Sequence, residues 1–268
     1  MTPSPSPTAA AAPAGATVRP SAFVFRAVTV DTPAGPILRH VDAEVPDAGV
    51  TVVVGPSGAG KSTLLRLCNR LEVPTQGQVR YRNRDVADLD PLALRREVGM
   101  VFQRPALFAG IVADNLRVAA PDASDDELAA TLERVALDPR LIDRPAATLS
   151  GGEAQRMSLA RTLITGPKVL LADEPAAALD ARPRLAFERL ARSLADNGLT
   201  VVWVTHDLDQ LHRLADHVLI LMGGRCAHTG SADTLATVGG EARMFLAGSC
   251  PTPCAHHESR NSPPADKN

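Results

Sequence analysis

The chain has 268 residues, of which 45% are hydrophobic and 22% are charged, and its formal net charge is −2 at pH 7. This length fits one large α/β domain or two small ones, and the hydrophobic fraction is ample for a core. The near-neutral charge predicts no binding of nucleic acid. No apolar stretch approaches the roughly 18–20 residues that a membrane-spanning helix needs, so we expect no direct insertion into a membrane.

Both ends of the chain have the composition of tails. Residues 1–20 and 249–268 are rich in Pro, Ala, Ser and Thr, which is typical of disorder. The first tail lacks the basic start and apolar stretch of a secretory leader, so we expect a cytoplasmic protein. The second tail contains residue types that bind soft metals, although a Pro-rich tail rarely preorganises a site. These residues are Cys250, Cys254, His256 and His257.

Between the tails, residues 21–248 alternate between short apolar runs and helical patterns. Continuous apolar runs, typical of parallel strands covered on both faces, occur at 50–54, 169–172, 200–205 and 217–221. Apolar residues at helical spacing predict helices at 64–71, 154–164, 185–194 and 208–214. Residues 104–148 break the alternation with helix candidates such as 125–136, which predicts a helical insertion. The whole pattern predicts an α/β domain with a site at the C-terminal ends of its strands.

The first candidate site follows the apolar run 50–54 directly. Its residues are Gly55, Pro56, Ser57, Gly58, Ala59, Gly60, Lys61, Ser62 and Thr63. The glycines allow backbone N–H groups to converge on an anion, and the following helix adds the positive end of its dipole. Lys61 would reach the β- and γ-phosphates and Ser62 would ligate Mg²⁺, so the loop predicts binding of a nucleoside triphosphate. The alternative is a glycine-rich turn that matches by chance.

A second candidate centre ends the apolar run 169–172. Asp173 lies at the strand tip, where it can hold Mg²⁺ directly or through water. Glu174 comes next and is placed to orient or deprotonate an attacking water. Pro175 stops the strand, because proline cannot donate to the ladder. An ordinary strand end with solvated acids is the simpler interpretation.

The third candidate lies just before the helix predicted at 154–164. Ser150 and Glu153 have the spacing of a capping box, which is the simpler interpretation. A cap does not require Gly151 and Gly152, since each glycine weakens a first helical turn. Their N–H groups make a second anion-binding helix end. Two phosphate sites with a single nucleotide loop make sense if the second serves a neighbouring copy of the chain.

These motifs and three further positions occur in the order 55–63, Gln103, 149–153, Asp173-Glu174, Leu179-Asp180 and His206. The order resembles the nucleotide-binding subunit of an ATP-binding cassette (ABC) transporter over most of residues 21–248. The resemblance implies the ABC ATPase fold, which is a P-loop NTPase parallel-sheet core with an antiparallel β edge and a helical subdomain, here at about 104–160. It also implies ATP and Mg²⁺ as ligands, and ATP hydrolysis coupled to transport across a membrane.

The resemblance further implies partners and residue roles. Two copies would form a head-to-tail homodimer that holds ATP between 55–63 of one subunit and 149–153 of the other, with Asp180 contacting the partner. Gln103 would contact Mg²⁺ and the attacking water, and His206 would hold the γ-phosphate while Glu174 activates the water. Integral-membrane permease subunits would keep the protein peripheral on the cytoplasmic face of the membrane. The simpler alternatives are that Gln103 is a solvated loop residue and that His206 caps the next helix together with Asp207.

The sequence departs from the family pattern at three positions. The family stacks adenine on an aromatic residue ahead of the phosphate loop, and counting back places that position at Val30. A valine gives apolar contact without stacking, so base selectivity is expected to be loose. Glu153 replaces the commoner Gln and keeps the capping geometry. Ala177 stands where a Ser is frequent, which would soften communication across the dimer.

Two questions stay open at the level of sequence. A non-transport ABC ATPase, acting in DNA repair or on ribosomes, is the alternative function, although such proteins carry a long coiled-coil insertion or two cassettes. The cargo is the second question. Residues 68–72 and 202–207 resemble small ATPases of metal or iron export, which is the favoured interpretation, whereas the Asn69-Arg70 pair also resembles phosphate importers.

Overall fold

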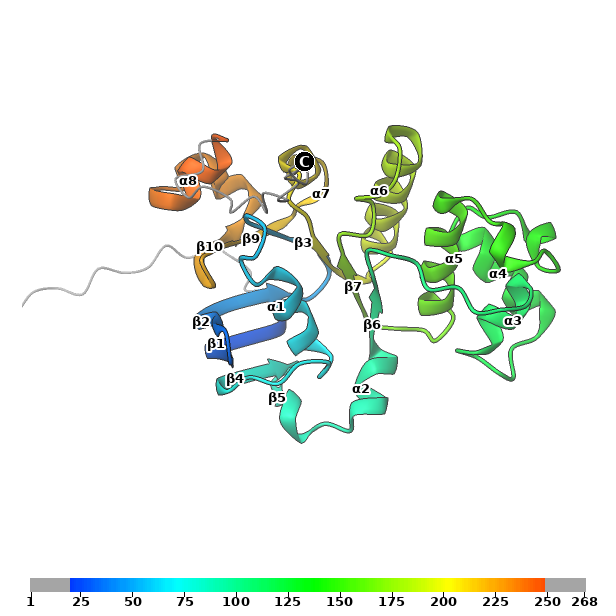
Figure 1. Ribbon diagram of the computed structural model, residues 1–268, viewed down its shortest axis with the longest axis horizontal. Helices are drawn as coiled ribbons and strands as arrows, with labels where there is room; N and C mark the ends of the chain where they lie inside the picture. Colours follow the sequence, from blue (N-terminus) through cyan, green and yellow to red (C-terminus); the bar gives the residue numbers. More distant parts are fainter. Residues whose placement is uncertain (1–19, 249–268) are drawn as a thin grey trace, which may run out of the picture.

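The computed structural model describes residues 20–248 (Figure 1). The tails expected at 1–20 and 249–268 therefore lie outside the described residues, apart from Pro20. The candidate metal ligands Cys250, Cys254, His256 and His257 lie outside them as well. Within residues 20–248, none of the helices combines the length and the apolarity that crossing a bilayer requires.

A six-stranded sheet forms the centre of the fold, with the order β10-β9-β3-β8-β7-β6. Its first five strands in chain order are parallel, and β10 pairs antiparallel with β9 at one edge. The strands are β3 (Gly49–Val54), β6 (Val98–Val101), β7 (Val169–Asp173), β8 (Thr200–Val204), β9 (His217–Met222) and β10 (Arg225–Ser231). Every residue of β3, β7 and β8 is buried, which explains their continuous apolar runs.

A second sheet has the order β2-β1-β4-β5 and is antiparallel throughout. Its strands are β1 (Ser21–Thr32), β2 (Gly35–Pro46), β4 (Gln76–Tyr81) and β5 (Arg84–Asp85). Buried and exposed residues alternate along much of β2, as in a sheet with one face on the core. This sheet is the antiparallel β part that the family resemblance implies.

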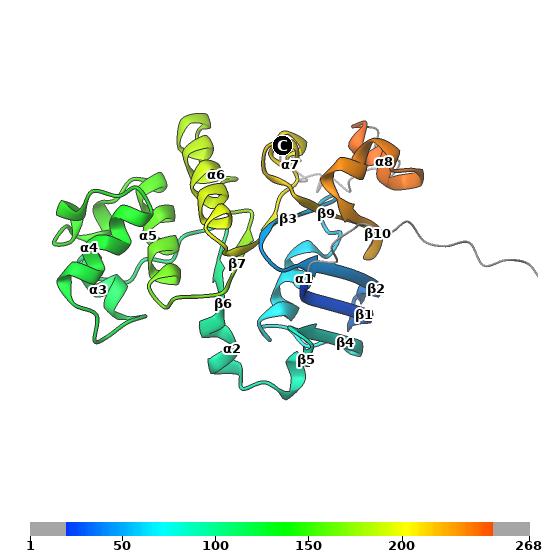
Figure 2. The same cartoon turned by 180° about the vertical axis from the view of Figure 1, so that it is seen from behind.

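Eight α-helices complete the described fold. They are α1 (Lys61–Cys68), α2 (Pro91–Glu97), α3 (Val112–Arg117), α4 (Asp125–Arg134), α5 (Gly151–Leu163), α6 (Ala181–Asp196), α7 (Leu208–Leu214) and α8 (Gly240–Leu246). Short 3₁₀ helices lie at Val86–Asp88, Pro139–Leu141, Ala146–Thr148 and Ala232–Thr237. Figures 1 and 2 show α3, α4 and α5 beyond β6, on the side away from β1 and β2. The segment at about 104–160 thus contains α3, α4 and most of α5.

Two hydrophobic clusters cover opposite faces of the parallel sheet. Val52 and Val54 of β3 belong to a cluster that includes residues of α5, α6 and α7. Val53, between them, belongs to a cluster shared with α1 and the antiparallel sheet. Leu170 and Leu171 of β7 divide in the same way, because successive strand residues face opposite sides. The expected α/β fold with helices on both faces is confirmed (Figure 1).

Candidate functional site

The loop at 55–63 joins the C-terminal end of β3 to the first turn of α1. Its glycines are required by the backbone, since φ is +154° at Gly55, +79° at Gly58 and +95° at Gly60. A Cβ at Gly55 would lie 2.1 Å from the carbonyl oxygen of Leu221, so backbone packing excludes a side chain there too. The loop therefore keeps backbone N–H groups beside the helix N-terminus, where an anion is favoured.

Lys61 is held inside this loop. The residue is 6% exposed, and Nζ donates to the carbonyl oxygens of Gly55 at 2.8 Å and Pro56 at 3.0 Å. Burial lowers the pKa of the ammonium, and the carboxylates of Glu174 and Asp173 oppose this shift. An ammonium has three donors, so one remains for a ligand after these two hydrogen bonds. The arrangement suits an added anion such as a phosphate.

Ser62 and Asp173 bring the first and second candidate centres together. Ser62 Oγ donates to Asp173 Oδ1 at 2.8 Å, and Asp173 as a whole is 7% exposed. Hydroxyl and carboxylate oxygens are ligands that Mg²⁺ prefers, with phosphate oxygens and water completing the shell. No group of three or more His, Cys, Asp or Glu side chains suited to a metal occurs within residues 20–248. The donors present therefore fit Mg²⁺ that arrives with a phosphate ligand.

Glu174 and His206 also contact each other at the C-terminal end of the parallel strands. Glu174 Oε2 lies 3.1 Å from His206 Nδ1, and their side chains are 21% and 60% exposed. Glu174 has a φ of +46°, a left-handed conformation that is strained for a residue with a side chain. Asp207, not His206, caps α7, since its carboxylate accepts from the N–H groups of Asp209 and Gln210. The capping interpretation is thus confirmed for Asp207, whereas the His206 ring contacts Glu174 instead.

Gln103 lies in the loop that follows β6, and its side chain is exposed. Because β6 pairs in parallel with β7, this loop leaves the same edge of the sheet as Asp173. Gln155 of α5 anchors the loop by donating from Nε2 to the carbonyl oxygen of Phe102 at 2.9 Å. The structure thus brings Gln103 to the correct edge, and its contact with Mg²⁺ stays a prediction.

Residues Ser150 and Glu153 form the expected capping box at the start of α5. The Glu153 carboxylate accepts from the Ser150 N–H at 2.8 Å, and the Ser150 hydroxyl accepts from the Glu153 N–H at 3.3 Å. A Cβ at Gly151 would meet no atom of residues 20–248 within 4 Å, so packing does not require glycine there. Both views show α5 and α1 on opposite sides of β6 and β7 (Figures 1 and 2). This helix end is therefore not part of the same chain's loop site.

Asp180 precedes α6 and is exposed. An aspartate at this position normally accepts from N–H groups of the first turn. Within the described residues, the Asp180 side chain makes no such capping hydrogen bond. Its carboxylate is therefore available for another contact.

The expectation for Val30 requires a correction. Val30 is 3% exposed and belongs to the hydrophobic cluster between β1, β2 and α1, so it offers no surface to a base. Counting back along the chain failed because the pairing of β1 with β2 shifts register on both sides of Val30. Ile37 lies beside the loop, since its Cγ2 is 3.5 Å from the place that a Cβ on Gly60 would take.

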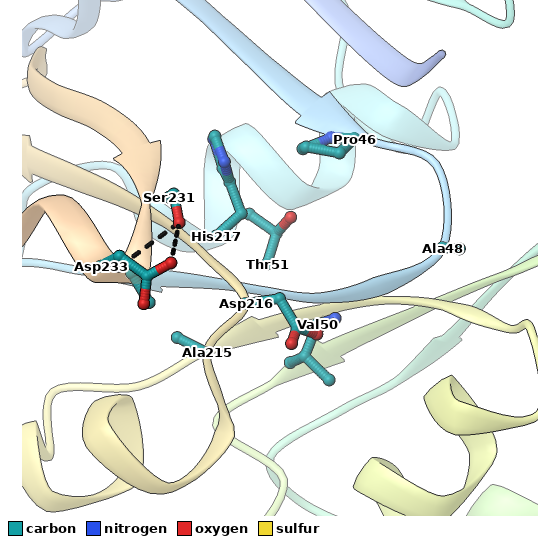
Figure 3. Close-up of a pocket in the computed structure, with 10 residues that line it drawn as sticks. Pro46, Ala48, Val50, Thr51, Ala215, Asp216, His217, Ser231 and Asp233 are labelled. Carbon is teal, nitrogen blue, oxygen red and sulfur yellow. Dashed lines mark hydrogen bonds between the residues drawn. The ribbon is translucent and has the colours of Figure 1, made fainter. Parts of the chain in front are cut away.

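A hollow of about 380 Å³ lies at the other end of the parallel strands (Figure 3). It is lined by the beginnings of β3 and β9 and by Ser231 and Asp233. Asp216 accepts there from the N–H of Val50 at 2.7 Å and from Arg192 at 2.6 Å. Burial lowers the pKa of His217, the one lining residue that could become a cation. This acidic hollow does not suit a polyphosphate.

Comparison with known proteins agrees with the geometry. A family model described as "ABC transporter" matches residues 38–177. "Protein STAR1" of Oryza sativa subsp. japonica is 48% identical over 193 residues, which are 70% of this chain and 56% of that protein. The chain thus spans little more than half the length of this relative. The "Phosphate import ATP-binding protein PstB" of Saccharolobus solfataricus is 36% identical over 218 residues, covering 75% of this chain and 84% of that protein.

Among solved structures, cbiO1 from Clostridium perfringens, part of the ABC transporter complex cbiONQ, has a TM-score of 0.75 at 26% sequence identity. The match covers 82% of this chain and 92% of cbiO1. The family model, the relatives and the fold agree with the order of motifs in the sequence. The chain belongs to the ABC transporter family and carries its ATPase domain.

Proposed function

We propose that the chain binds ATP with Mg²⁺ and hydrolyses it, and that this reaction drives a separate integral-membrane subunit. The observation that carries the proposal is the convergence of two contacts at one sheet edge, Ser62 with Asp173 and Glu174 with His206. The phosphate loop supplies the anion site beside them, with Lys61 poised for the β- and γ-phosphates.

The residues divide the chemistry among them. Ser62 and Asp173 would hold Mg²⁺, with Gln103 from the β6 loop as a further ligand, and Mg²⁺ when bound neutralises charge on the phosphates. Glu174 accepts a proton from, or orients, the attacking water. His206 holds the Glu174 carboxylate by its 3.1 Å contact and would face the γ-phosphate of bound ATP. Glu174 directly follows β7 and has a left-handed backbone conformation, so the chain turns at this carboxylate.

The site is half of a composite site. Ser150, Gly151, Gly152 and Glu153 of a second copy would cover the phosphates bound to 55–63, with Asp180 contacting that copy. Three features support a head-to-tail homodimer. Helix α5 lies apart from the loop, the space beside Gly151 is open, and the Asp180 carboxylate makes no capping hydrogen bond to α6. Hydrolysis should then depend on closure of the dimer around ATP.

Exposed apolar side chains near the Gln103 loop support the contact with a membrane subunit. These residues are Leu71, Val73, Phe102, Phe108 and Val118. They lie on both sides of the Gln103 loop, since Asn69 at the end of α1 contacts Met100 and Asn115 of α3 bonds to Phe108. Large apolar side chains left exposed on neighbouring segments are candidates for a protein contact. Docking there would hold the chain at the cytoplasmic face of the membrane, and the loop of Gln103 would sense the transport channel.

For the cargo, we propose phosphate taken up by import, on the similarity to the phosphate import protein PstB. The Asn69-Arg70 pair after α1 agrees with this proposal. Export of iron or another metal is the second candidate, on residues 68–72 and 202–207. A non-transport ABC ATPase is the alternative to both, and it would need no membrane partner.

Reconstitution of the chain with its native membrane subunit in lipid vesicles tests the proposal. Transport of labelled phosphate that requires ATP, and that stops with Glu174→Gln, is the expected result. Iron movement without phosphate movement would select the second candidate. ATP hydrolysis with no association to any membrane subunit would favour the non-transport alternative.

A further inference from the structure

We propose that Glu188 and Gln210 are positioning residues for hydrolysis, which hold the His206 loop against helix α6. The proposal rests on the roles of Glu174 and His206 given above. It goes beyond them by assigning a function to a buried polar network that includes neither the phosphate loop nor the proposed metal ligands. The network connects the helix that follows Asp180 with the helix that follows His206.

Gln210 is the centre of the network. Its Oε1 accepts from Thr205 Oγ1 at 2.6 Å and from Trp203 Nε1 at 3.3 Å. Its Nε2 donates to Glu188 Oε1 at 2.9 Å. One side chain on the first turn of α7 therefore joins β8 on one side to α6 on the other. His206 follows Thr205 directly, so its backbone is fixed from the side of the sheet.

Glu188 is the residue of the network whose burial costs the most free energy, because it is a buried carboxylate. It is 3% exposed, and its two carboxylate oxygens accept from Nε and Nη2 of Arg213 at 2.8 and 3.0 Å. Burying a charge costs free energy, and replacing a buried ion pair with apolar residues of similar volume often leaves stability unchanged or higher. A buried carboxylate at the contact of α6 with α7 therefore points to a role in fixing geometry, since several hydrogen bonds specify one arrangement.

Arg184 adds a second connection, one helical turn before Glu188. Its Nη2 donates to the carbonyl oxygen of Leu179 at 3.1 Å, and its Nη1 lies 3.7 Å from Asp207 Oδ2. Leu179 precedes the proposed dimer contact Asp180, and Asp207 follows His206. The same face of α6 thus contacts the segments on both sides of the proposed γ-phosphate site.

The network borders the reacting groups directly. A small cavity of about 60 Å³ is lined by Glu174 and His206, and Arg184 and Gln210 form part of its wall. A shift of α6 at the dimer contact would therefore be transmitted to the His206–Glu174 pair. Misplacement of a catalytic group by about 1 Å can cost up to about a hundredfold in rate.

The test uses a reciprocal exchange of the two side chains in the membrane-bound complex. Glu188→Gln removes the carboxylate that Arg213 needs, and Gln210→Glu places a second carboxylate beside Glu188. Each single variant should lower kcat between about tenfold and a hundredfold. The KM for ATP should stay within about twofold, since the phosphate loop is unchanged.

The double variant Glu188→Gln/Gln210→Glu keeps one carboxylate and one amide. The carboxylate introduced at position 210 can accept from Thr205, from Trp203 and from the amide introduced at position 188. The oxygen of that amide can in turn accept from Arg213. Recovery of kcat to within about threefold of the wild type is expected, because the network is restored in reverse. The ring resonances of His206, assigned by loss in His206→Ala, should move in both single variants and return in the double.

Asp216→Asn is the matched control, since it breaks another ion pair, with Arg192, at the other end of the sheet. It should lower the melting temperature with kcat unchanged. Wild-type kcat in both single variants would overturn the proposal, and so would losses of kcat that merely follow melting temperature across all variants. Full activity in Glu174→Gln would instead overturn the proposed function, so the two failures are distinguishable.

Discussion

Ser62 and Asp173 are 111 residues apart in the chain, and Ser62 Oγ donates to Asp173 Oδ1 at 2.8 Å. The parallel register of the sheet brings them together, because Val53 of β3 and Asp173 of β7 both pair with Val204 of β8. The phosphate loop therefore begins level with the carboxylate. The order of three strands thus joins two motifs that are each ambiguous in sequence into one hydrogen-bonded pair, which we propose as the Mg²⁺ site.

We expect Ser62→Ala to raise the Mg²⁺ concentration needed for half-maximal ATP hydrolysis by about tenfold, because one oxygen ligand is lost. Ser62→Thr keeps the hydroxyl and is the conservative control, expected to restore the Mg²⁺ dependence. Steady-state ATPase assays over a range of Mg²⁺ concentrations make the measurement. An unchanged Mg²⁺ dependence in Ser62→Ala would show that Ser62 serves only to hold Asp173.

Glu174→Gln should bind ATP and form a stable dimer, while turnover falls by about a hundredfold or more, because an amide cannot accept the proton of water. Size-exclusion chromatography with ATP and a turnover assay measure the two effects. Glu97→Gln is the matched control, since Glu97 pairs with Lys168 at 3.0 Å and is not part of the site. Normal turnover in Glu174→Gln would mean that another base acts.

Gly151→Ala distinguishes the effect of this glycine on the stability of one chain from its effect on ATP hydrolysis by the dimer. Alanine is a better helix former than glycine by up to about 1 kcal/mol, and the new Cβ would meet no atom of the described residues within 4 Å. The variant should therefore melt at the same or a higher temperature and bind ATP as a monomer. ATP hydrolysis should fall, because the Cβ would occupy space that a partner's phosphates need. Undiminished hydrolysis would argue against a phosphate at this helix end.

The strands buried on both faces are the part of the fold that periodicity predicts well. Runs such as 50–54 and 169–172 are apolar at every position because β3 and β7 face a cluster on each side. Strand β6 is not predicted by this pattern, because it has only four residues and one of them is Gly99. That glycine is needed because a Cβ would lie 2.4 Å from Thr162 Cγ2 of α5. The need for glycine at this position therefore comes from packing against α5, about 60 residues later in the chain, and short-range sequence patterns do not reveal it.

The N-terminal hairpin shows a second limit. Bulges between β1 and β2 shift the pairing around Val30, so the position that faces a ligand cannot be found by counting residues. The motifs at 55–63 and 173–174 were predictable because short-range chemistry dictates them. The hydrogen-bonding of Gln210 with Glu188 was not, because it depends on how α6 and α7 pack.

Val30→Ala should act on stability and not on the choice of base. Removal of two buried methyl groups is expected to lower the free energy of unfolding by about 1–3 kcal/mol. The ratio of kcat/KM for ATP to that for GTP should not change, since Val30 offers no surface to a ligand. That ratio should be small in the wild type, because residues 31–37 contain no aromatic side chain to stack on adenine. Denaturant unfolding and paired ATP and GTP assays check both statements, and a changed ratio in Val30→Ala would contradict the first.

The capping box of α5 should make stability depend on pH in the acid range. The backbone N–H of Ser150, and then its hydroxyl, lower the pKa of Glu153 below the ordinary 4.5. A carboxylate whose folded-state pKa is lowered stabilises the fold fully above the unfolded-state pKa. This contribution is lost as the pH falls through the folded-state pKa, so it should fade below about pH 4.5.

Glu153→Gln removes this titration and keeps an oxygen that can accept from Ser150. The difference in free energy of unfolding between wild type and variant should be constant above about pH 5.5 and shrink below pH 4.5. Its size should stay below about 1 kcal/mol, because the Glu153 side chain is partly exposed. Glu127→Gln in the matching box of α4 is the control, since Ser124 lowers the pKa of Glu127 in the same way. The control should show the same pH dependence. If the difference in free energy of unfolding for Glu153→Gln grew as the pH fell, the predicted direction of the pH dependence would be wrong.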